Sequence, residues 1–300
     1  MKKQKLLYRQ HEILLRDKNR TLAYKKAIEK TVKKNDVVLD LGCGSGIFSF
    51  MAAQKGCAKV YAVENTEIIR QAKETALSNR LEDKIEFHHT DIMKFIPDQK
   101  IDVLIHEQIG SFIWNEDMLE KVKYIRENFA EKKIKIIPAG IDIYAAPVCH
   151  KNTADMSYAF WGQKPYGFDF SNFQNMALIE NIRNGIYPAI LNLKNRSSFI
   201  AGEKRIHRID FRKTLQMPEI LKTDFKILRP AGFTGICVYF KAHLGSRLIL
   251  ESGPGSNTHW GQIFLFRFRG LPVNKGDILS FILYPDTNPL KWKYHFSTKK

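Results

Sequence analysis

Three glycines alternate with other residues directly after a short apolar segment. Residues 37–41 read Val-Val-Leu-Asp-Leu, and Gly42, Gly44 and Gly46 follow them. Glycine permits a tight turn, and its missing side chain lets a bulky ligand approach the backbone. The spacing lacks the Gly-x-x-Gly step of the usual dinucleotide fingerprint. We therefore expect a strand, a tight turn and a helix that hold a cofactor other than a nicotinamide dinucleotide.

Three acidic residues stand at the ends of expected strands. Asp40 precedes the glycines, where a carboxylate can face a cationic amino-acid group. Glu64 ends the next strand, where an acid can accept hydrogen bonds from both ribose hydroxyls and repels a 2′-phosphate. Asp91 ends the following strand and is expected to accept from an adenine amino group; a helix cap or a surface position is its alternative. Open α/β sheets bind ligands at these strand ends, so we expect S-adenosylmethionine here, the alternative being a glycine turn with incidental acids.

Two glutamates bracket an apolar stretch after the fourth expected strand. Glu107 and Glu116 enclose Phe112-Ile-Trp114. Carboxylates in such surroundings are costly unless they meet a cation, and a guanidinium matches them in charge and planar geometry. Methyl transfer from a sulfonium to a guanidinium brings two cations together, and two carboxylates offset that repulsion. The alternative is a surface loop in which Glu116 only begins the next helix.

Short apolar segments alternate with helical patterns through the first half of the chain. Residues 1–35 have helical periodicity. The expected strands are 37–41, 59–63, 85–88, 101–105 and 134–137, and the expected helices between them are 47–54, 67–79 and 118–129. This alternation predicts a doubly wound, Rossmann-like parallel sheet with helices on both faces.

The pattern changes near residue 147. Residues 150–195 are rich in aromatic residues, Asn and Gly, and shorter alternating segments follow them. These segments are 204–211, 235–244, 247–250, 262–268 and 277–283. They predict a mostly antiparallel β-barrel or sandwich. We expect two domains, residues 1–147 with the cofactor and residues 148–300 for the substrate.

Composition narrows the function classes. The four cysteines are far apart in the 300 residues, so neither a metal site nor a disulfide framework is expected. No apolar run approaches the roughly 20 residues of a membrane span, and no secretion signal is visible, so we expect a cytoplasmic protein without membrane contact. The 48 basic against 31 acidic residues give a net charge of +17. Such an excess favours encounters with RNA or other anions; a lysine-rich solvated surface is the alternative.

Four motifs together resemble the protein arginine methyltransferase family over nearly the whole chain. Glu107 and Glu116 match its double-glutamate loop, and Thr258-His259-Trp260 matches its Thr-His-Trp loop. Residues 11–24 resemble the helix that closes over the cofactor, and residues 166–171 resemble part of the dimerisation arm. The resemblance implies transfer of a methyl group from S-adenosylmethionine, which becomes S-adenosylhomocysteine, to a guanidinium nitrogen of a protein or peptide arginine.

The resemblance also implies roles for single residues. Arg20 is expected to pair with the cofactor carboxylate, and Asp17 to pair with His259 and hold it for proton release. We expect His259, Trp260 and Met118 to contact the substrate. Without the resemblance, His259 and Trp260 are ordinary structural residues as readily as site residues. An arm at about 150–190 is expected to form a homodimer.

Other activities remain open at this point. The same residues suit a small guanidino metabolite, and a non-catalytic scaffold that binds partners is a further reading. A nucleic-acid methyltransferase would be expected to carry an Asn/Asp-Pro-Pro-Tyr-type motif or a cysteine mechanism, which Glu107-Gln-Ile-Gly110 does not match. A charge of +17 repels arginine-rich tails at long range, so we expect a less basic substrate, one bound to RNA, or a small guanidino compound.

Overall fold

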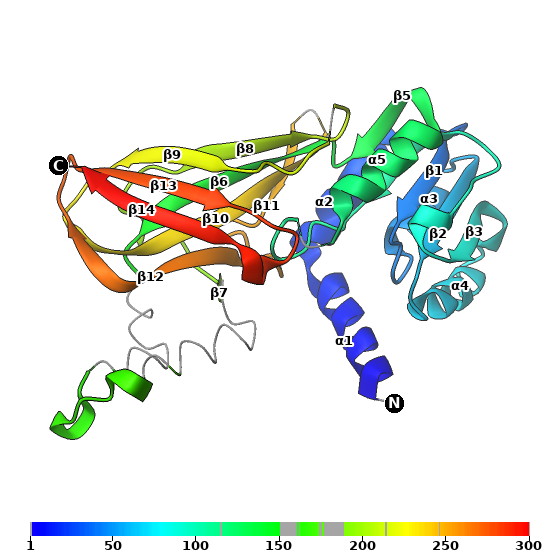
Figure 1. The fold of residues 1–300 in the computed structure, drawn as a ribbon. Coiled ribbons are helices and arrows are strands. Elements are labelled where there is room, and N and C mark those ends of the chain that lie inside the picture. Colours follow the sequence, from blue (N-terminus) through cyan, green and yellow to red (C-terminus); the bar gives the residue numbers. More distant parts are fainter. Residues whose placement is uncertain are drawn as a thin grey trace.

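Two helices precede the first strand. The computed structural model describes residues 2–114, 116–150, 161, 163–173, 176, 189–213, 215–245 and 247–299, and every structural statement concerns these. Helix α1 (Lys2–Arg16) leads away from the body of the molecule, whereas α2 (Lys18–Thr31) packs against that body (Figure 1). The break falls at Asp17, whose carboxylate accepts from the Arg20 backbone N–H at 2.9 Å and caps α2. Both helices fall within the residues expected to be helical.

A five-stranded parallel sheet follows, in the order β3-β2-β1-β4-β5. Its strands are β1 (Val37–Leu41), β2 (Lys59–Glu64), β3 (Ile85–His89), β4 (Ile101–His106) and β5 (Ala130–Ile137). All five residues of β1 are buried, since this strand lies between β2 and β4. The strand order reverses between β1 and β4, which is where sheets of this kind bind ligands.

Three helices connect these strands: α3 (Ile47–Gln54), α4 (Ile68–Ser78) and α5 (Met118–Asn128). The connections through α3 and α4 run from β1 towards β3, and the connection through α5 runs the other way. Right-handed crossovers therefore put α5 on the opposite face from α3 and α4. The predicted doubly wound sheet is confirmed.

The second half forms two antiparallel sheets. One has the order β7-β12-β10-β6-β8 with β11 beside β10, and the other has the order β14-β13-β9. The strands are β6 (Gly140–Val148), β7 (Ala189–Leu191), β8 (Lys204–Asp210), β9 (Leu221–Lys226), β10 (Ala231–Gly245), β11 (Leu248–Glu251), β12 (Gln262–Val273), β13 (Ile278–Tyr284) and β14 (Lys293–Lys299). The five expected segments are present, and β6, β7, β9 and β14 are additional. Strand β6 pairs with β8 and β10, so this sheet begins ahead of residue 147.

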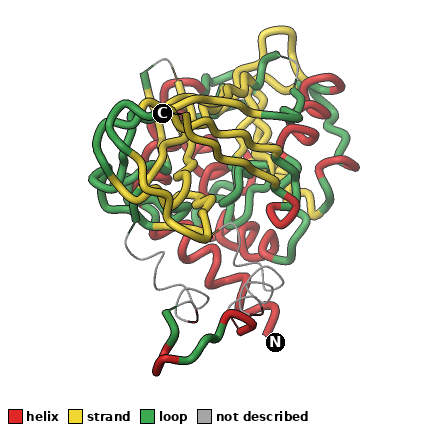
Figure 2. Tube along the Cα trace, turned by 60° about the vertical axis from the view of Figure 1, so that its left-hand side comes forward, coloured by secondary structure: helices red, strands yellow, loops and turns green. Residues whose placement is uncertain are grey.

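The expected dimerisation arm, about 150–190, lies mostly outside the described residues. Its described part includes a short 3-10 turn, η4 (Pro165–Gly167), in which Tyr166 is 95% exposed. Trp161 stacks on Phe173 with ring centroids 5.2 Å apart. Figure 2 shows this piece lying apart from the sheets. Among all the described helices, none is long and apolar enough to cross a membrane.

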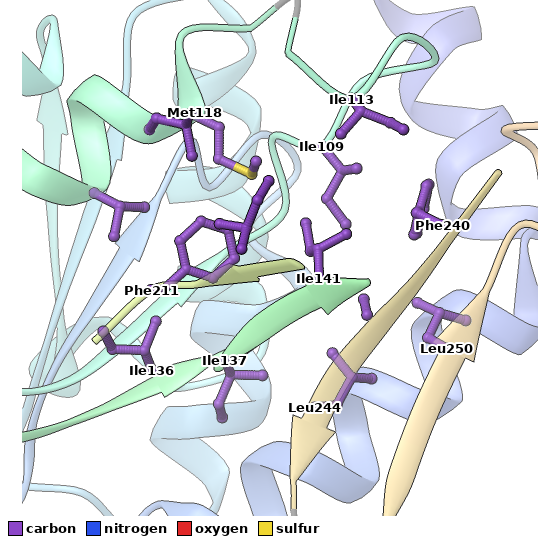
Figure 3. Packing of buried hydrophobic residues seen from close by; sticks show 14 of the residues in the cluster. Ile109, Ile113, Met118, Ile136, Ile137, Ile141, Phe211, Phe240, Leu244 and Leu250 are labelled. Atoms are coloured by element: carbon purple, nitrogen blue, oxygen red, sulfur yellow. The ribbon is translucent and has the colours of Figure 1, made fainter. Parts of the chain in front are cut away.

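A continuous apolar core joins the two halves. Ile137 and Met118 come from the parallel-sheet half, and Ile141, Phe211 and Phe240 from the antiparallel half, all nearly inaccessible to solvent. Figure 3 shows these side chains packed together where the two halves meet. The loop after β4 is anchored in the same core through Ile109 and Ile113, which are also labelled there. The loop that carries the two glutamates therefore has fixed apolar supports.

Candidate functional site

The glycine loop adopts a backbone that other residues resist. Gly42, Gly44 and Gly46 have φ values of +71°, +52° and +83°, in the left-handed region. A Cβ on Gly42 would lie 2.6 Å from Gln108 Nε2, and one on Gly44 would lie 2.6 Å from His11 Cε1. The loop thus needs glycine both for its conformation and for the side chains packed against it.

Two of the three predicted acids are held at this loop. Glu64 Oε2 accepts from the Gly44 N–H at 3.1 Å, and Oε1 accepts from the Thr66 N–H at 2.8 Å. Asp40 is 1% exposed and accepts from the Ser49 hydroxyl at 2.6 Å. Burial raises the pKa of Asp40 to about 6, because the interior disfavours its charged form.

The third acid has a local role. Asp91 is exposed, and its Oδ1 accepts from the Met93 N–H at 2.8 Å. It caps the 3-10 turn η2 (Ile92–Lys94), which is the alternative that the sequence left open. Its side chain is not part of the cavity beside the glycine loop.

That cavity has a volume of about 280 Å³. Its lining combines the glycine loop, α1, α2 and the loop after β4: Leu7, Gln10, His11, Leu14, Leu15, Arg20, Asp40, Gly42, Cys43, Gly44, Ser45, Ile47, Phe48, Glu64, Thr66, Glu107, Gln108 and Glu116. Thr66 Oγ1 and Gln108 Oε1 are buried there with no hydrogen-bond partner among the described residues. Orphaned polar atoms beside a glycine loop suit a polar ligand such as S-adenosylmethionine. We refer to this space as the cofactor cavity.

Glu107 is bound by a guanidinium of the protein itself. Arg20 donates from both Nε and one terminal nitrogen to Glu107 Oε2, with the Nε bond at 2.8 Å. The two side chains are only 6% and 10% exposed. Arg20 also lies over the Phe48 ring, 4.9 Å from its centroid. Arg20 lines the cofactor cavity, so its expected contact with the cofactor is compatible with its position. Both of its bonds go to Oε2 of Glu107, which leaves Oε1 for another donor.

Glu116 differs from Glu107 in having no side-chain partner among the described residues. Glu116 is exposed, yet partial desolvation by the surrounding protein and repulsion from Glu107 raise its pKa, while Lys121 and His259 act in the opposite direction. Lys121 Nζ donates to the Glu116 backbone oxygen at 2.9 Å. The Glu116 carboxylate therefore has no direct ion pair among the described residues, and a guanidinium ligand would supply one.

His259 and Asp17 meet across the two halves of the chain. Asp17 Oδ2 lies 2.8 Å from His259 Nδ1 and accepts from the His259 N–H at 2.9 Å. This is the contact that the family resemblance implies, made between the cap of α2 and the loop before β12. The hydrogen bonds with His259 lower the pKa of Asp17, although burial opposes them. The His259 ring is thereby fixed, with Nε2 as its remaining nitrogen.

A second cavity, of about 490 Å³, adjoins the first. Its lining residues are Arg9, Gln10, Ile13, Leu14, Glu107, Gly110, Ser111, Glu116, His259 and Trp260. We refer to it as the acceptor cavity. Glu107 and Glu116 line both spaces, as do Gln10 and Leu14. The two carboxylates therefore stand between the two cavities.

Trp260 and Met118 occupy different positions. Trp260 lines the acceptor cavity with part of its ring, although it is 2% exposed and packs edge-on against Phe240. Met118 is 1% exposed and lines neither cavity. Its side chain points into the core beside Phe211 (Figure 3). The structure does not bring Met118 to the site, because the first turn of α5 directs it inward.

Sequence reasoning missed several lining residues. His11, Gln108 and Phe48 each face the cofactor cavity, and Arg9 faces the acceptor cavity. Gln108 adjoins Glu107 in sequence, so its position was available as a signal. Arg9 gave no such signal, because a single arginine in a charged helix resembles a solvated surface residue.

Comparisons with known proteins identify the family of both halves of the chain. A family model for a methyltransferase domain matches residues 32–166, and one for the arginine methyltransferase oligomerization subdomain matches residues 141–294. Protein arginine N-methyltransferase 1 of Saccharomyces cerevisiae is 30% identical over 281 residues, covering 90% of this chain and 78% of the relative. Protein arginine N-methyltransferase 1 of Dictyostelium discoideum is 28% identical over 280 residues, covering 90% and 79%.

Solved structures share the fold. The Trypanosoma brucei PRMT1 enzyme–prozyme heterotetrameric complex with AdoHcy superposes with a TM-score of 0.81 at 24% identity, covering 96% of both chains. Arabidopsis thaliana protein arginine methyltransferase 10 gives a TM-score of 0.81 at 23% identity, covering 97% of this chain and 92% of that one. With a family model matching more than half of its residues, and a relative 30% identical along most of its length, the chain belongs to the protein arginine N-methyltransferase family.

Proposed function

We propose that this chain transfers a methyl group from S-adenosylmethionine to a guanidinium nitrogen of an arginine in a protein or peptide. As a protein arginine N-methyltransferase it is an S-adenosylmethionine-dependent enzyme. The observation that carries the specific proposal is the position of Glu107 and Glu116 in the lining of both cavities. Groups shared by the two spaces can hold an acceptor directly beside the cofactor.

The cofactor cavity has polar groups for the ribose and for the amino-acid end of the ligand. Bound S-adenosylmethionine supplies an electrophilic methyl group on a sulfonium. Gly42 and Gly44 form the tight turn beside the cavity, with Gln108 and His11 packed against them. Glu64 is oriented by two N–H groups to accept from ribose hydroxyls. Asp40 faces the amino-acid end, and Arg20 offers a guanidinium to its carboxylate. Asp91 has the weakest case, because its carboxylate caps a local turn.

The acceptor guanidinium is bound by the two glutamates. Arg20 already holds Glu107 in place and leaves Oε1 open, while the Glu116 carboxylate has no ion pair among the described residues. Two carboxylates on one guanidinium fix its plane and draw its positive charge away from the reacting nitrogen. The same charges offset the repulsion between two neighbouring cations.

His259 is the proposed proton acceptor. Asp17 binds Nδ1 and the backbone N–H of His259, so the ring has one orientation and keeps Nε2 for the acceptor cavity. A histidine held in this way can take the proton that leaves the methylated nitrogen. Trp260 packs against the His259 ring, with centroids 4.2 Å apart, and forms an apolar wall of the same cavity.

Three broader properties are also proposed. The oligomerization subdomain match supports a homodimer formed through the arm at about 150–190. The net charge of +17 supports acceptors that are less basic than arginine-rich tails or are bound to RNA. A cytoplasmic location is proposed with them. The pairing of β6 with β10 supports a domain boundary at 138–139, in place of the division into 1–147 and 148–300.

A charge-neutral substitution of Glu116 tests the proposal. Glu116→Gln is expected to reduce methylation of arginine peptides by at least about a hundredfold, because one carboxylate that binds the guanidinium is lost. S-adenosylhomocysteine affinity should change little. Glu120→Gln removes the same charge from the first turn of α5 at an exposed position outside both cavities, and serves as the control. Glu116→Gln activity within tenfold of the parent would contradict the assignment.

A further inference from the structure

Helix α1 divides its faces between the two cavities. Residues at positions i and i+4 of a helix lie on the same side. Arg9 and Ile13 line the acceptor cavity alone, and Gln10 and Leu14, one position further, line both cavities. Leu7, His11 and Leu15 line the cofactor cavity alone. Helix α1 therefore has one face on each cavity, and Gln10 and Leu14 form the strip between the two faces.

The face towards the acceptor cavity carries a cation. Arg9 is exposed and has no hydrogen bond or ion pair within the described part of the chain. Its neighbour on the helix, Glu12, is bound to Arg16 at 2.7 Å. The other arginine of the site, Arg20, is bound to Glu107. Arg9 is thus a permanently charged group that lines the cavity without a direct ion pair to any described carboxylate.

An unpaired arginine is unexpected in a cavity proposed to receive a guanidinium. Like charges repel, so Arg9 would weaken the binding of an acceptor that carries only positive charge. An acceptor that also carries a carboxylate converts this repulsion into attraction. The cavity volume of about 490 Å³ is within the usual range of roughly 300–1,000 Å³ for ligand sites, so the lining can contact more than the guanidinium itself.

We propose that Arg9 binds a carboxylate of the acceptor and selects acceptors in which a guanidinium and a carboxylate lie close together. This inference rests on the proposed arginine methylation. In a peptide the carboxylate belongs to an aspartate or glutamate beside the target arginine. In free arginine it is the α-carboxylate. Either carboxylate supplies the negative charge that pairs with Arg9, whose positive charge Glu107 and Glu116 do not neutralise.

Matched peptides test the selection. One peptide carries a single arginine flanked by aspartate in a glycine and serine background, and its partner has asparagine in place of aspartate. We expect the wild-type kcat/KM to favour the aspartate peptide about threefold to tenfold, with the preference decreasing as salt is added. Arg9→Gln should abolish the preference, mainly through KM, and Arg9→Glu should reverse it. Arg16→Gln, two turns further along α1 and outside the acceptor cavity, should leave it intact.

A binding measurement separates this inference from the proposed function. The two peptides are titrated calorimetrically in the presence of S-adenosylhomocysteine. Tighter binding of the aspartate peptide that depends on Arg9, without any turnover, would refute methylation and leave the role of Arg9 standing. Turnover of both peptides with equal kcat/KM, or equal losses for both in Arg9→Gln, would overturn the inference for peptide acceptors and leave only the α-carboxylate of free arginine as a source.

Free arginine and agmatine, which lacks the carboxylate, form the small-molecule comparison. Arg9-dependent preference for arginine over agmatine supports the inference and identifies the α-carboxylate as a source. Equal use of arginine and agmatine, together with an Arg9-dependent preference for the aspartate peptide, supports it with the acidic side chain as the source. Absence of both preferences overturns it.

Discussion

Arg20 donates two N–H groups to a single oxygen of Glu107, and the two side chains are almost entirely buried. Glu116, which shares both cavities with Glu107, has no such partner. The two glutamates have the same proposed role in binding the acceptor, but only Glu107 also forms a buried ion pair that can stabilise the fold.

This difference predicts unequal effects on stability. Glu107→Ala leaves Arg20 buried and unpaired, and we expect it to lower the free energy of unfolding by about 3–5 kcal/mol. Glu116→Ala should change it by about 0.5 kcal/mol or less, since no side-chain partner is lost. Urea denaturation measures both. Equal losses in the two variants would show that the Arg20–Glu107 contact does not support the fold.

The raised pKa of Glu116 predicts an acid limit to activity. Binding of a guanidinium needs the ionised carboxylate, so kcat/KM should fall tenfold per pH unit below that pKa, starting at a higher pH than for an ordinary glutamate. Lys121 favours ionisation, so Lys121→Met should move the limit to higher pH. Lys123→Met, an exposed change on the same helix, should not. Coincident profiles for all three proteins would argue against Glu116 as the titrating group.

Asp40 is expected to cost stability at neutral pH. Its pKa in the folded protein, about 6, lies above the ordinary value of 3.8, so folding disfavours the charged form. The favourable contribution of the protonated acid is complete below pH 3.8 and is lost as pH rises through 6. Asp40→Asn should therefore raise the free energy of unfolding at pH 8 by up to about 3 kcal/mol, and the gain should vanish near pH 3.5. Cofactor affinity should fall in the same variant.

Asp17 combines a helix cap with the support of His259, and two substitutions separate these roles. Asparagine also caps helices, so Asp17→Asn should keep the stability of α2 within about 0.5 kcal/mol. It removes the charge beside His259, so kcat should fall at least tenfold. Asp17→Ala should lose both, with a further cost of about 1 kcal/mol. If Asp17→Asn retains full kcat, His259 does not depend on this carboxylate.

The glycine loop predicts a substitution that acts through a neighbour. Gly44 and Gly56 both have positive φ, so alanine at either position strains the backbone by about 1 kcal/mol. Only at Gly44 does the added Cβ meet another side chain, that of His11, whereas Gly56 has open space. Gly44→Ala should weaken S-adenosylhomocysteine binding at least tenfold, and Gly56→Ala should not. Similar affinities by calorimetry would remove His11 from the cofactor cavity.

Local patterns are sufficient to predict the parallel sheet and the turn after its first strand. The segment 37–46 has an apolar strand, an acid and glycines in fixed order. Each of these features depends on the backbone conformation of only a few neighbouring residues. The predicted role of Met118 in the site is not supported, because its side chain is buried in the core. Periodicity places Met118 on α5 but does not show which way the first turn of that helix directs it. Asp91 was ambiguous for a similar reason, since a strand end and a helix cap require the same residue type.

Long-range relationships were less visible. Residues 140–148 follow β5 after a short turn, and an apolar strand does not reveal whether its partners run parallel or antiparallel. Its partner β10 lies far along the chain. Arg9 became informative only when the walls of the acceptor cavity were known. The pairing of Asp17 with His259 likewise spans both halves and came from family resemblance rather than from spacing.

The position of β6 between β10 and β8 has a consequence for biosynthesis. Residues 140–148 leave the ribosome well before residues 231–245, yet β10 is the neighbour that covers one edge of β6. Before β10 is synthesised, the backbone N–H and C=O groups on that edge of the largely apolar strand β6 have no strand partner, and such edges favour aggregation. A nascent chain arrested between these strands should therefore depend on chaperones, even though the parallel sheet that precedes β6 is already synthesised.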